Sequence, residues 1–218
     1  MTRPATHIWR LFKWGITLAR HRALVGIEHD PNAPGPVRRM AKLARWVAFT
    51  GTSGERDYAG AFRDIGPAAI KLGQTLATRP DLVGEEPARN LLKLQDDLPP
   101  VPFEKIRASI EASFEQPLEA LWSEFDPVPI GAASIAQVHR ATTTDGRQVA
   151  VKVLRPGVRE RFARDIDTYE WAAAHLESFG VEAARLRPRL VIANFKRWTN
   201  RELDLRREAA SASELAEH

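Results

Sequence analysis

Two neighbouring segments with strand-like alternation constrain the fold of this chain more than any other feature. The first runs from Ala136 to Thr142 and the second from Arg147 to Leu154, with the sequence Thr144-Asp145-Gly146 between them. Runs rich in β-branched residues on either side of a short Asp-Gly link are typical of a β-hairpin. We therefore predict an antiparallel hairpin in which Ala150 and Lys152 share one face of the second strand and the neighbouring valines take the other.

Lys152 stands out within this predicted hairpin because it lies between Val151 and Val153. A lysine on an inward-facing side of a sheet costs free energy unless its charge is paired, which favours a functional reading. The alternative is an ordinary hairpin that happens to carry one inward lysine.

The segment leading into the hairpin has the spacing of the glycine-rich nucleotide loop of protein kinases, G-x-G-x-x-G-x-V, with Ala133 and Ala136 at the second and third glycine positions. Lys152 follows Val138 by fourteen residues, which suits one strand, a tight turn and half of a return strand. In kinases the corresponding alanine covers the adenine and the lysine contacts the α- and β-phosphates. We predict a nucleotide site formed by Ile130, Gly131, Ala132, Ala133, Ser134, Ile135, Ala136, Gln137, Val138, Ala150 and Lys152.

The two alanines should change how this loop binds phosphate. An added methyl group restricts the backbone and limits its approach to a ligand. We expect nucleotide binding to be retuned by Ala133 and Ala136, and not abolished.

Most of the rest of the chain has helical periodicity. Helices are predicted at 8–19, 38–49, 62–76 and 103–114, and Gly66-Pro67 is expected to start or kink the third. A last helix is predicted from Pro188 to the C-terminus. The fold class expected is α+β, with a helical region at residues 1–118 and a region at 119–218 that carries the small antiparallel sheet.

The first two predicted helices are basic and amphipathic. Trp9, Trp14 and Trp46 accompany their arginines and lysines, a composition that suits an anionic membrane surface. Equally, both helices could pack on the domain and leave a solvated basic face.

Composition excludes several other classes of protein. The chain has 218 residues, a formal net charge of +4 and no cysteine, so disulfides and thiolate metal sites are excluded. No apolar stretch approaches the ~20 residues of a membrane-spanning helix. We expect no secretory signal, and no nucleic-acid partner because the basic residues are dispersed.

Four motifs in order closely resemble the UbiB family of atypical kinases, which is associated with ubiquinone biosynthesis. They are Lys71-Leu-Gly-Gln74, the alanine-rich loop from Pro129 to Arg140, Val149-Ala-Val-Lys152 followed by Arg155-Pro-Gly157, and Glu202-Leu-Asp204 ahead of Arg207-Glu-Ala-Ala210. The resemblance covers residues 62–218. It implies a helical extension packed on a kinase-like N-lobe, binding of ATP or ADP with Mg²⁺, and a peripheral location on the cytoplasmic side of a bacterial inner membrane. Implied partners are an anionic membrane surface or an isoprenoid lipid, and proteins of ubiquinone biosynthesis.

The resemblance also assigns roles to single residues. Lys71, Gly73 and Gln74 would form an occluding motif over the nucleotide site, whereas their pattern alone indicates a solvated polar stripe. Glu202 and Asp204 would be the partners of Lys71, and Glu208 would form an ion pair with Lys152. Asp204 and Glu208, four residues apart, are predicted to share one helical face.

The chain reaches only ten residues past Glu208. A kinase C-lobe, with its catalytic-loop and metal-binding residues, is expected to be absent, so that Mg²⁺ ligands would lie outside this chain and catalysis would be incomplete. Asp165 and Asp167 come too early in the chain for those roles. We expect a fragment of a longer protein, with a truncated gene as the alternative; a non-catalytic membrane- or partner-binding module is the alternative function.

Overall fold

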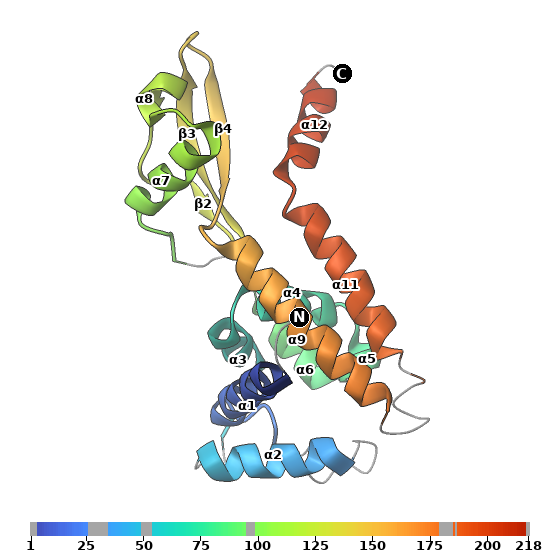
Figure 1. Cartoon of the computed structure of the whole chain (residues 1–218). Coiled ribbons are helices and arrows are strands. Elements are labelled where there is room, and N and C mark those ends of the chain that lie inside the picture. Colours follow the sequence, from blue (N-terminus) through green and yellow to red (C-terminus); the bar gives the residue numbers. More distant parts are fainter. Residues whose placement is uncertain are drawn as a thin grey trace. The chain divides into compact units, whose positions relative to one another are not determined.

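The computed structural model describes residues 4–25, 35–48, 54–94, 99–178, 185 and 187–216. The chain divides into two compact units (Figure 1). Unit 1 comprises Met1–Gln95 with Arg161–Trp198, and unit 2 comprises Asp96–Glu160 with Thr199–His218. The division at residue 118 that the sequence suggests stays a prediction. Each unit is described by itself below.

Unit 1 is helical. It contains α1 (Pro4–Arg20), α2 (Gly35–Ala48), α3 (Tyr58–Ile65), α4 (Pro67–Ala77), α5 (Pro80–Val83) and α6 (Glu85–Leu91), with most of α9 (Val158–Glu177) and α11 (Pro188–Glu202). The predicted interruption at Gly66-Pro67 is confirmed, because α3 ends before it and α4 begins with the proline. Gly66 has φ of 131°, a backbone conformation that favours glycine.

Unit 2 holds the sheet. Its elements are α7 (Phe103–Phe114), α8 (Leu118–Leu121), β1 (Trp122–Phe125), β2 (Gly131–Ala132), β3 (Ala136–Thr143), β4 (Gln148–Leu154) and α12 (Leu205–Ala216). All pairs are antiparallel: β4 lies along one edge of β3, and β1 and β2 pair with successive parts of the other edge. The predicted α+β class with a small antiparallel sheet is confirmed.

The predicted hairpin is formed by β3 and β4. Its turn closes through the amide of Gly146, which donates to the carbonyl of Thr143 at 2.9 Å, and Gly146 has φ of 88°. In the pairing register Val138 opposes Lys152 and Arg140 opposes Ala150. The alternation of β4 is confirmed, since Val153 is buried whereas Ala150 and Lys152 are exposed.

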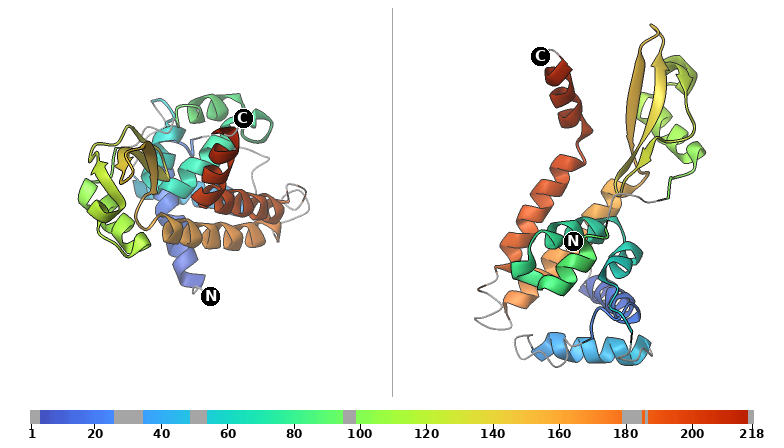
Figure 2. Two further views of the ribbon diagram at one scale, coloured as in Figure 1. Left: turned by 90° about the horizontal axis from the view of Figure 1, so that it is seen from above. Right: turned by 180° about the vertical axis from the view of Figure 1, so that it is seen from behind.

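One expectation about Lys152 is wrong. Its side chain is 37% exposed, so it lies on the open face of the strand and does not carry the cost of a buried charge. The valine face is the buried one, because Val151 and Val153 pack with Ile106 and Ile110 of α7 in the core of unit 2. Helix α7 lies beside the hairpin (Figure 2). That core consists of Ile106, Ile110, Leu118 and Val153, surrounded by half-buried aromatic and aliphatic side chains.

A polar network ties β3 to the segment before α7. Gln137 accepts the amide of Val101 at 2.8 Å through Oε1 and donates to its carbonyl at 3.4 Å. His139 Nδ1 lies 2.7 Å from the carbonyl oxygen of Asp126, which only accepts, so this nitrogen carries the proton. Its Nε2 is then the acceptor for Gln137 Nε2 at 2.8 Å. Both side chains are fully buried, and the network satisfies their polar atoms.

We predict that Gln137→Leu destabilises unit 2 by about 2–4 kcal/mol, because it removes both hydrogen bonds to the Val101 peptide and leaves the buried His139 Nε2 without a partner. Equilibrium urea unfolding checks this. Gln148→Leu is the matched control, since Gln148 is exposed on β4 and its loss should cost less than about 0.5 kcal/mol. Equal effects of the two substitutions would contradict the role of the network.

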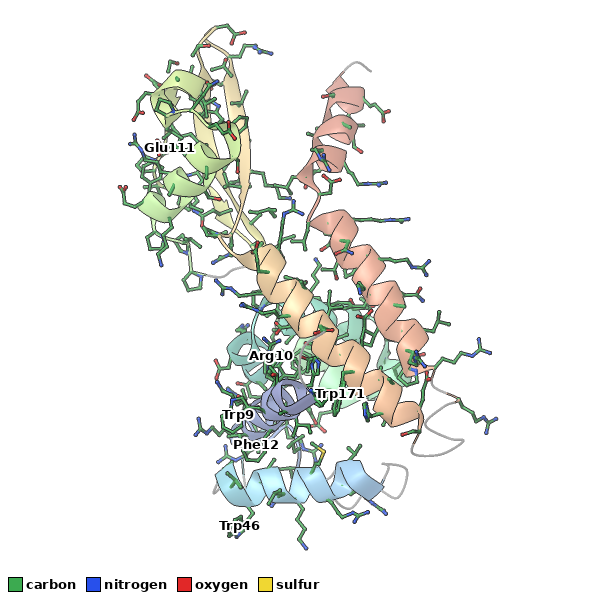
Figure 3. The ribbon with its side chains drawn as sticks, in the orientation of Figure 1. Trp9, Arg10, Phe12, Trp46, Glu111 and Trp171 are labelled. Carbon is green, nitrogen blue, oxygen red and sulfur yellow. The ribbon has the colours of Figure 1, made fainter. Side chains whose placement is uncertain are left out.

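The two basic helices of unit 1 differ in how much of their aromatic and apolar surface is packed against other helices. On α1, His7 stacks on Trp171 with ring centroids 5.6 Å apart, Trp14 contacts Tyr169, and Arg10 donates to the carbonyl of Arg164 at 2.6 Å. Helix α1 therefore packs on α9 (Figure 3). Helix α2 buries Ala41 and Ala44 but leaves Met40, Leu43 and Trp46 exposed.

The predicted single C-terminal helix is wrong. Helix α11 ends at Glu202 and α12 begins at Leu205, so Asp204 lies between two helices. Arg159 donates a hydrogen bond to the carbonyl of Leu203 within this break. Asp204 and Glu208 consequently do not lie on one helix, because a side chain distant in sequence takes a carbonyl at the break.

Within the part of the chain that the structure describes, no helix combines the length and the apolar character needed to cross a membrane.

Candidate functional site

The kinase-like loop forms the connection between β2 and β3. Gly131 opposes Val138, and the amide of Ala133 donates to the carbonyl of Ala136 at 2.8 Å. Ser134, Ile135 and Ala136 are buried, and Ser134 is only 1% exposed. The tip of the loop is therefore closed, unlike an open phosphate-binding turn.

Arg155 holds the loop in this conformation. Its Nε donates to the carbonyl of Ala133 at 2.8 Å, and its amide donates to the carbonyl of Ile135 at the same distance. A third bond joins its guanidinium to the carbonyl of Pro99 at 3.0 Å. The arginine that follows the lysine strand thus fixes the loop that precedes it, which gives a structural role to the Arg155-Pro-Gly157 motif.

The structure brings together Lys152 and Glu208. The ammonium of Lys152 donates to both carboxylate oxygens of Glu208, at 2.8 and 2.7 Å. Glu208 lies in the first turn of α12, where a negative charge also interacts favourably with the helix dipole. Both side chains are substantially exposed. An exposed pair of this kind contributes at most about 1 kcal/mol to stability, so its geometry matters more than its energy.

Of the eleven predicted nucleotide residues, Ile130 and Ala150 line one cavity of unit 2, Lys152 lines a second, and the other eight line neither. The Ala150 cavity, of about 460 Å³, is lined by Ile130 and Ala150 together with Glu124, Asp126, Arg140, Ala141, Thr142, Gln148 and Val149. The Lys152 cavity, of about 480 Å³, lies between α7, β4 and the start of α9 and includes Lys152, Arg155 and Leu205. Each volume is that of a small-molecule site. Gln137 reaches neither cavity, because its side chain bonds to Val101.

In unit 1 the Lys71-Leu-Gly-Gln74 motif organises the packing of α4. A Cβ added at Gly73 would lie 2.4 Å from a methyl group of Leu94 and 2.7 Å from the ring of Phe62, so only glycine fits without a shift. The side chain of Gln74 donates to the carbonyl of Leu94 at 3.0 Å. Gly73 and Gln74 thus hold the segment after α6 against α4.

Lys71 projects from the same helix toward an aromatic ring. Its ammonium lies over Trp198 of α11, 4.9 Å from the ring centroid. A cation at this distance from an indole is attracted by the ring's quadrupole. Sequence reasoning missed Trp198, because nothing in the spacing of the motifs connects residues 71 and 198.

We predict a coupling free energy of about 0.5–1 kcal/mol between Lys71 and Trp198. The measurement is a double-mutant cycle of Lys71→Met and Trp198→Leu by chemical denaturation, with Lys93→Met and Trp198→Leu as the control cycle. Additive effects of Lys71→Met and Trp198→Leu would show that the contact contributes nothing.

Glu202 and Asp204, the predicted partners of Lys71, belong to unit 2, and this partnership stays a prediction. Asp204 receives two hydrogen bonds from Arg206, at 2.7 and 3.1 Å. These bonds and the charge of Arg206 hold the pKa of Asp204 below its ordinary value. Its carboxylate is therefore ionised near neutral pH and paired with Arg206.

No group of three metal-ligating side chains occurs among the described residues. Asp165 and Asp167 both lie on α9. Asp165 is 3.8 Å from Arg10, and burial raises the pKa of its carboxyl. Asp167 is 3.8 Å from His7.

Comparison with known proteins places these residues in context. Residues 93–218 match the ABC1 atypical kinase-like domain. A protein of Marinobacter nauticus named probable protein kinase UbiB is 38% identical over 96% of this chain and 39% of its own length. One with the same name from Shewanella loihica is 39% identical over 80% of this chain and 33% of its own length. The resemblance to UbiB proteins is confirmed, and the chain spans well under half of either relative.

Among solved structures, the chain is similar to Rv3197 from Mycobacterium tuberculosis, solved in complex with erythromycin. The match covers 66% of this chain and 36% of the Rv3197 chain. The sequence identity is 32% and the TM-score is 0.41.

Proposed function

Because the chain belongs to the ABC1 atypical kinase-like family, we propose that it is the N-terminal part of a UbiB-like atypical kinase or ATPase that binds ATP and supports ubiquinone biosynthesis. One observation carries the nucleotide part of this proposal. Lys152, in register with Val138, is held by both carboxylate oxygens of Glu208. A lysine fixed in this way on a strand, after a loop of kinase spacing, is the arrangement that positions phosphates in kinases.

In this proposal ATP or ADP binds to the open face of the hairpin. Ile130 and Ala150, which line one cavity, supply the apolar contacts for the adenine. Lys152 contacts the α- and β-phosphates, and Glu208 keeps its ammonium in place. The buried tip at Ser134 to Ala136 contributes shape more than hydrogen bonds, because the amide of Ala133 already donates to the carbonyl of Ala136.

The residues that would complete catalysis are proposed to lie in the part of the relatives that this chain does not span. Mg²⁺, when bound, would neutralise the charge that develops on the phosphates. The proposed location is the cytoplasmic side of a bacterial inner membrane, with peripheral attachment and with ubiquinone-biosynthesis proteins as partners.

A second candidate is a non-catalytic module that binds a membrane or a protein partner. The closed loop tip and the division of Ala150 and Lys152 between two cavities favour it. It differs from the first candidate in requiring no nucleotide.

We predict that Lys152→Ala weakens binding of Mg²⁺-ATP at least about tenfold, the loss of one charge-assisted phosphate contact. Binding is measured by fluorescence titration of a labelled nucleotide on the purified chain. Lys196→Ala is the matched control, because Lys196 makes an equivalent two-oxygen pair with Glu170 at 2.9 and 3.0 Å and has similar exposure. Equal affinities of wild type and Lys152→Ala would exclude the assignment and favour the second candidate.

We further predict that Lys71→Ala changes the ratio of ATP to ADP affinity, because the proposed occluding cation would be gone. The same titration with both nucleotides checks this, and Lys93→Ala serves as control on an exposed lysine of unit 1. An unchanged ratio would argue against placement of Lys71 near the nucleotide.

A further inference from the structure

A third cavity lies wholly within unit 1, at a distance in sequence from every predicted nucleotide residue. Its volume is about 640 Å³ and it is open to solvent. Its described walls are almost entirely apolar and come from α1, α2, α4, α5, α9 and α11, with Ile8, Met40, Leu82, Trp171 and Val191 among the lining residues. This volume falls within the range of small-molecule sites.

Several large side chains of this cavity stay exposed to water. Ile8, Met40, Leu82 and Val191 are each between 43% and 56% exposed. Burial of such side chains contributes about 0.8 kcal/mol per methylene group. Apolar side chains gathered from six helices around one opening therefore favour an apolar occupant.

The basic residues on the helices beside the opening indicate that the ligand carries a negative charge. Helices α1 and α2 contain no acidic residue, and α2 carries Arg38, Arg39, Lys42 and Arg45. The acidic residues of α9 lie beside cations: Asp165 beside Arg10, Glu170 beside Lys196 and Glu177 beside Arg189. Arg39 and Lys42 are exposed on α2, on either side of Met40 in the sequence. Trp46 projects from α2 on the side away from α1 (Figure 3). Cations beside an apolar opening, with an exposed tryptophan, are typical of a surface for anionic lipids.

We propose that this cavity binds an acyl chain of an anionic phospholipid, and that the cations of α2 contact its headgroup. The inference deepens the membrane part of the proposed function and is independent of nucleotide binding in unit 2. An anionic lipid accounts for both observations. Its acyl chain is apolar, like the cavity walls, and its phosphate is opposite in charge to the basic residues of α2. A partner helix would need an elongated apolar groove, whereas the opening here has the size of a small-molecule site.

The test uses dihexanoyl phosphatidylglycerol below its micellar concentration as the probe, titrated into the 218-residue chain by calorimetry. We expect saturable binding, and weaker binding of dihexanoyl phosphatidylcholine. Two pairs of matched variants locate the site. Val191→Asp places a carboxylate in the wall, and Leu190→Asp places one beside it on α11 but outside the cavity, at 43% and 48% exposure. Met40→Gln and Leu43→Gln form the equivalent pair on α2, at 54% and 51% exposure.

We expect Val191→Asp and Met40→Gln each to weaken binding of the probe about fivefold or more, and their neighbours to change it less than about twofold. If Val191→Asp lowers the melting temperature strongly, the α2 pair decides. Absent binding, or equal losses within both pairs, would overturn the proposed site. Equal affinity for the two lipids would overturn the role of the cations.

Flotation with phosphatidylcholine vesicles that contain or lack phosphatidylglycerol separates this inference from the proposed location. Binding to anionic vesicles without binding of the monomeric probe would leave the membrane location intact and remove the acyl-chain site. Failure of nucleotide titration would not affect either result.

Discussion

Residue-by-residue pairing between β3 and β4 determines where the side chains of the candidate nucleotide site lie. A slip by one residue would exchange the two faces of β4 and turn Lys152 toward the core. Two buried features oppose such a slip. Val153 packs with Ile106 and Ile110, and Gln137 anchors β3 to the peptide of Val101. The exposed position of Lys152 therefore depends on the buried side of the same hairpin.

The loop before the hairpin shows how a kinase-like spacing can be used differently. Where kinases have glycines, Ala133 and Ala136 carry methyl groups, and Ala136 is buried. Arg155 then bonds to the loop backbone and closes it. A small-residue loop of this kind is held by Arg155, the residue after β4, which limits how far the loop can adapt to phosphate.

In unit 1 the Lys71-Leu-Gly-Gln74 motif serves packing as well as any role toward a nucleotide. Gly73 allows close approach of Leu94 and Phe62, Gln74 bonds to Leu94, and Lys71 extends to Trp198. Two of the three residues that the resemblance assigns to occlusion thus have local structural partners. Most apolar side chains of α4 are buried. Those of α2, such as Met40 and Trp46, stay exposed, and Met40 lines the apolar cavity.

The sequence by itself determined the features that depend on short-range preferences. Periodicity and turn residues located the hairpin, its alternation, the break at Gly66-Pro67 and the main helices, because each is fixed by neighbours within a few residues. Tertiary structure decided the rest. It paired Lys152 with Glu208 and closed the loop through the bond from Arg155 to Ala133. It also joined Arg159 to the helix break at Leu203 and Lys71 to Trp198. All these contacts are between residues far apart in the chain. No local pattern encodes such contacts, since they arise only when folding brings the segments together.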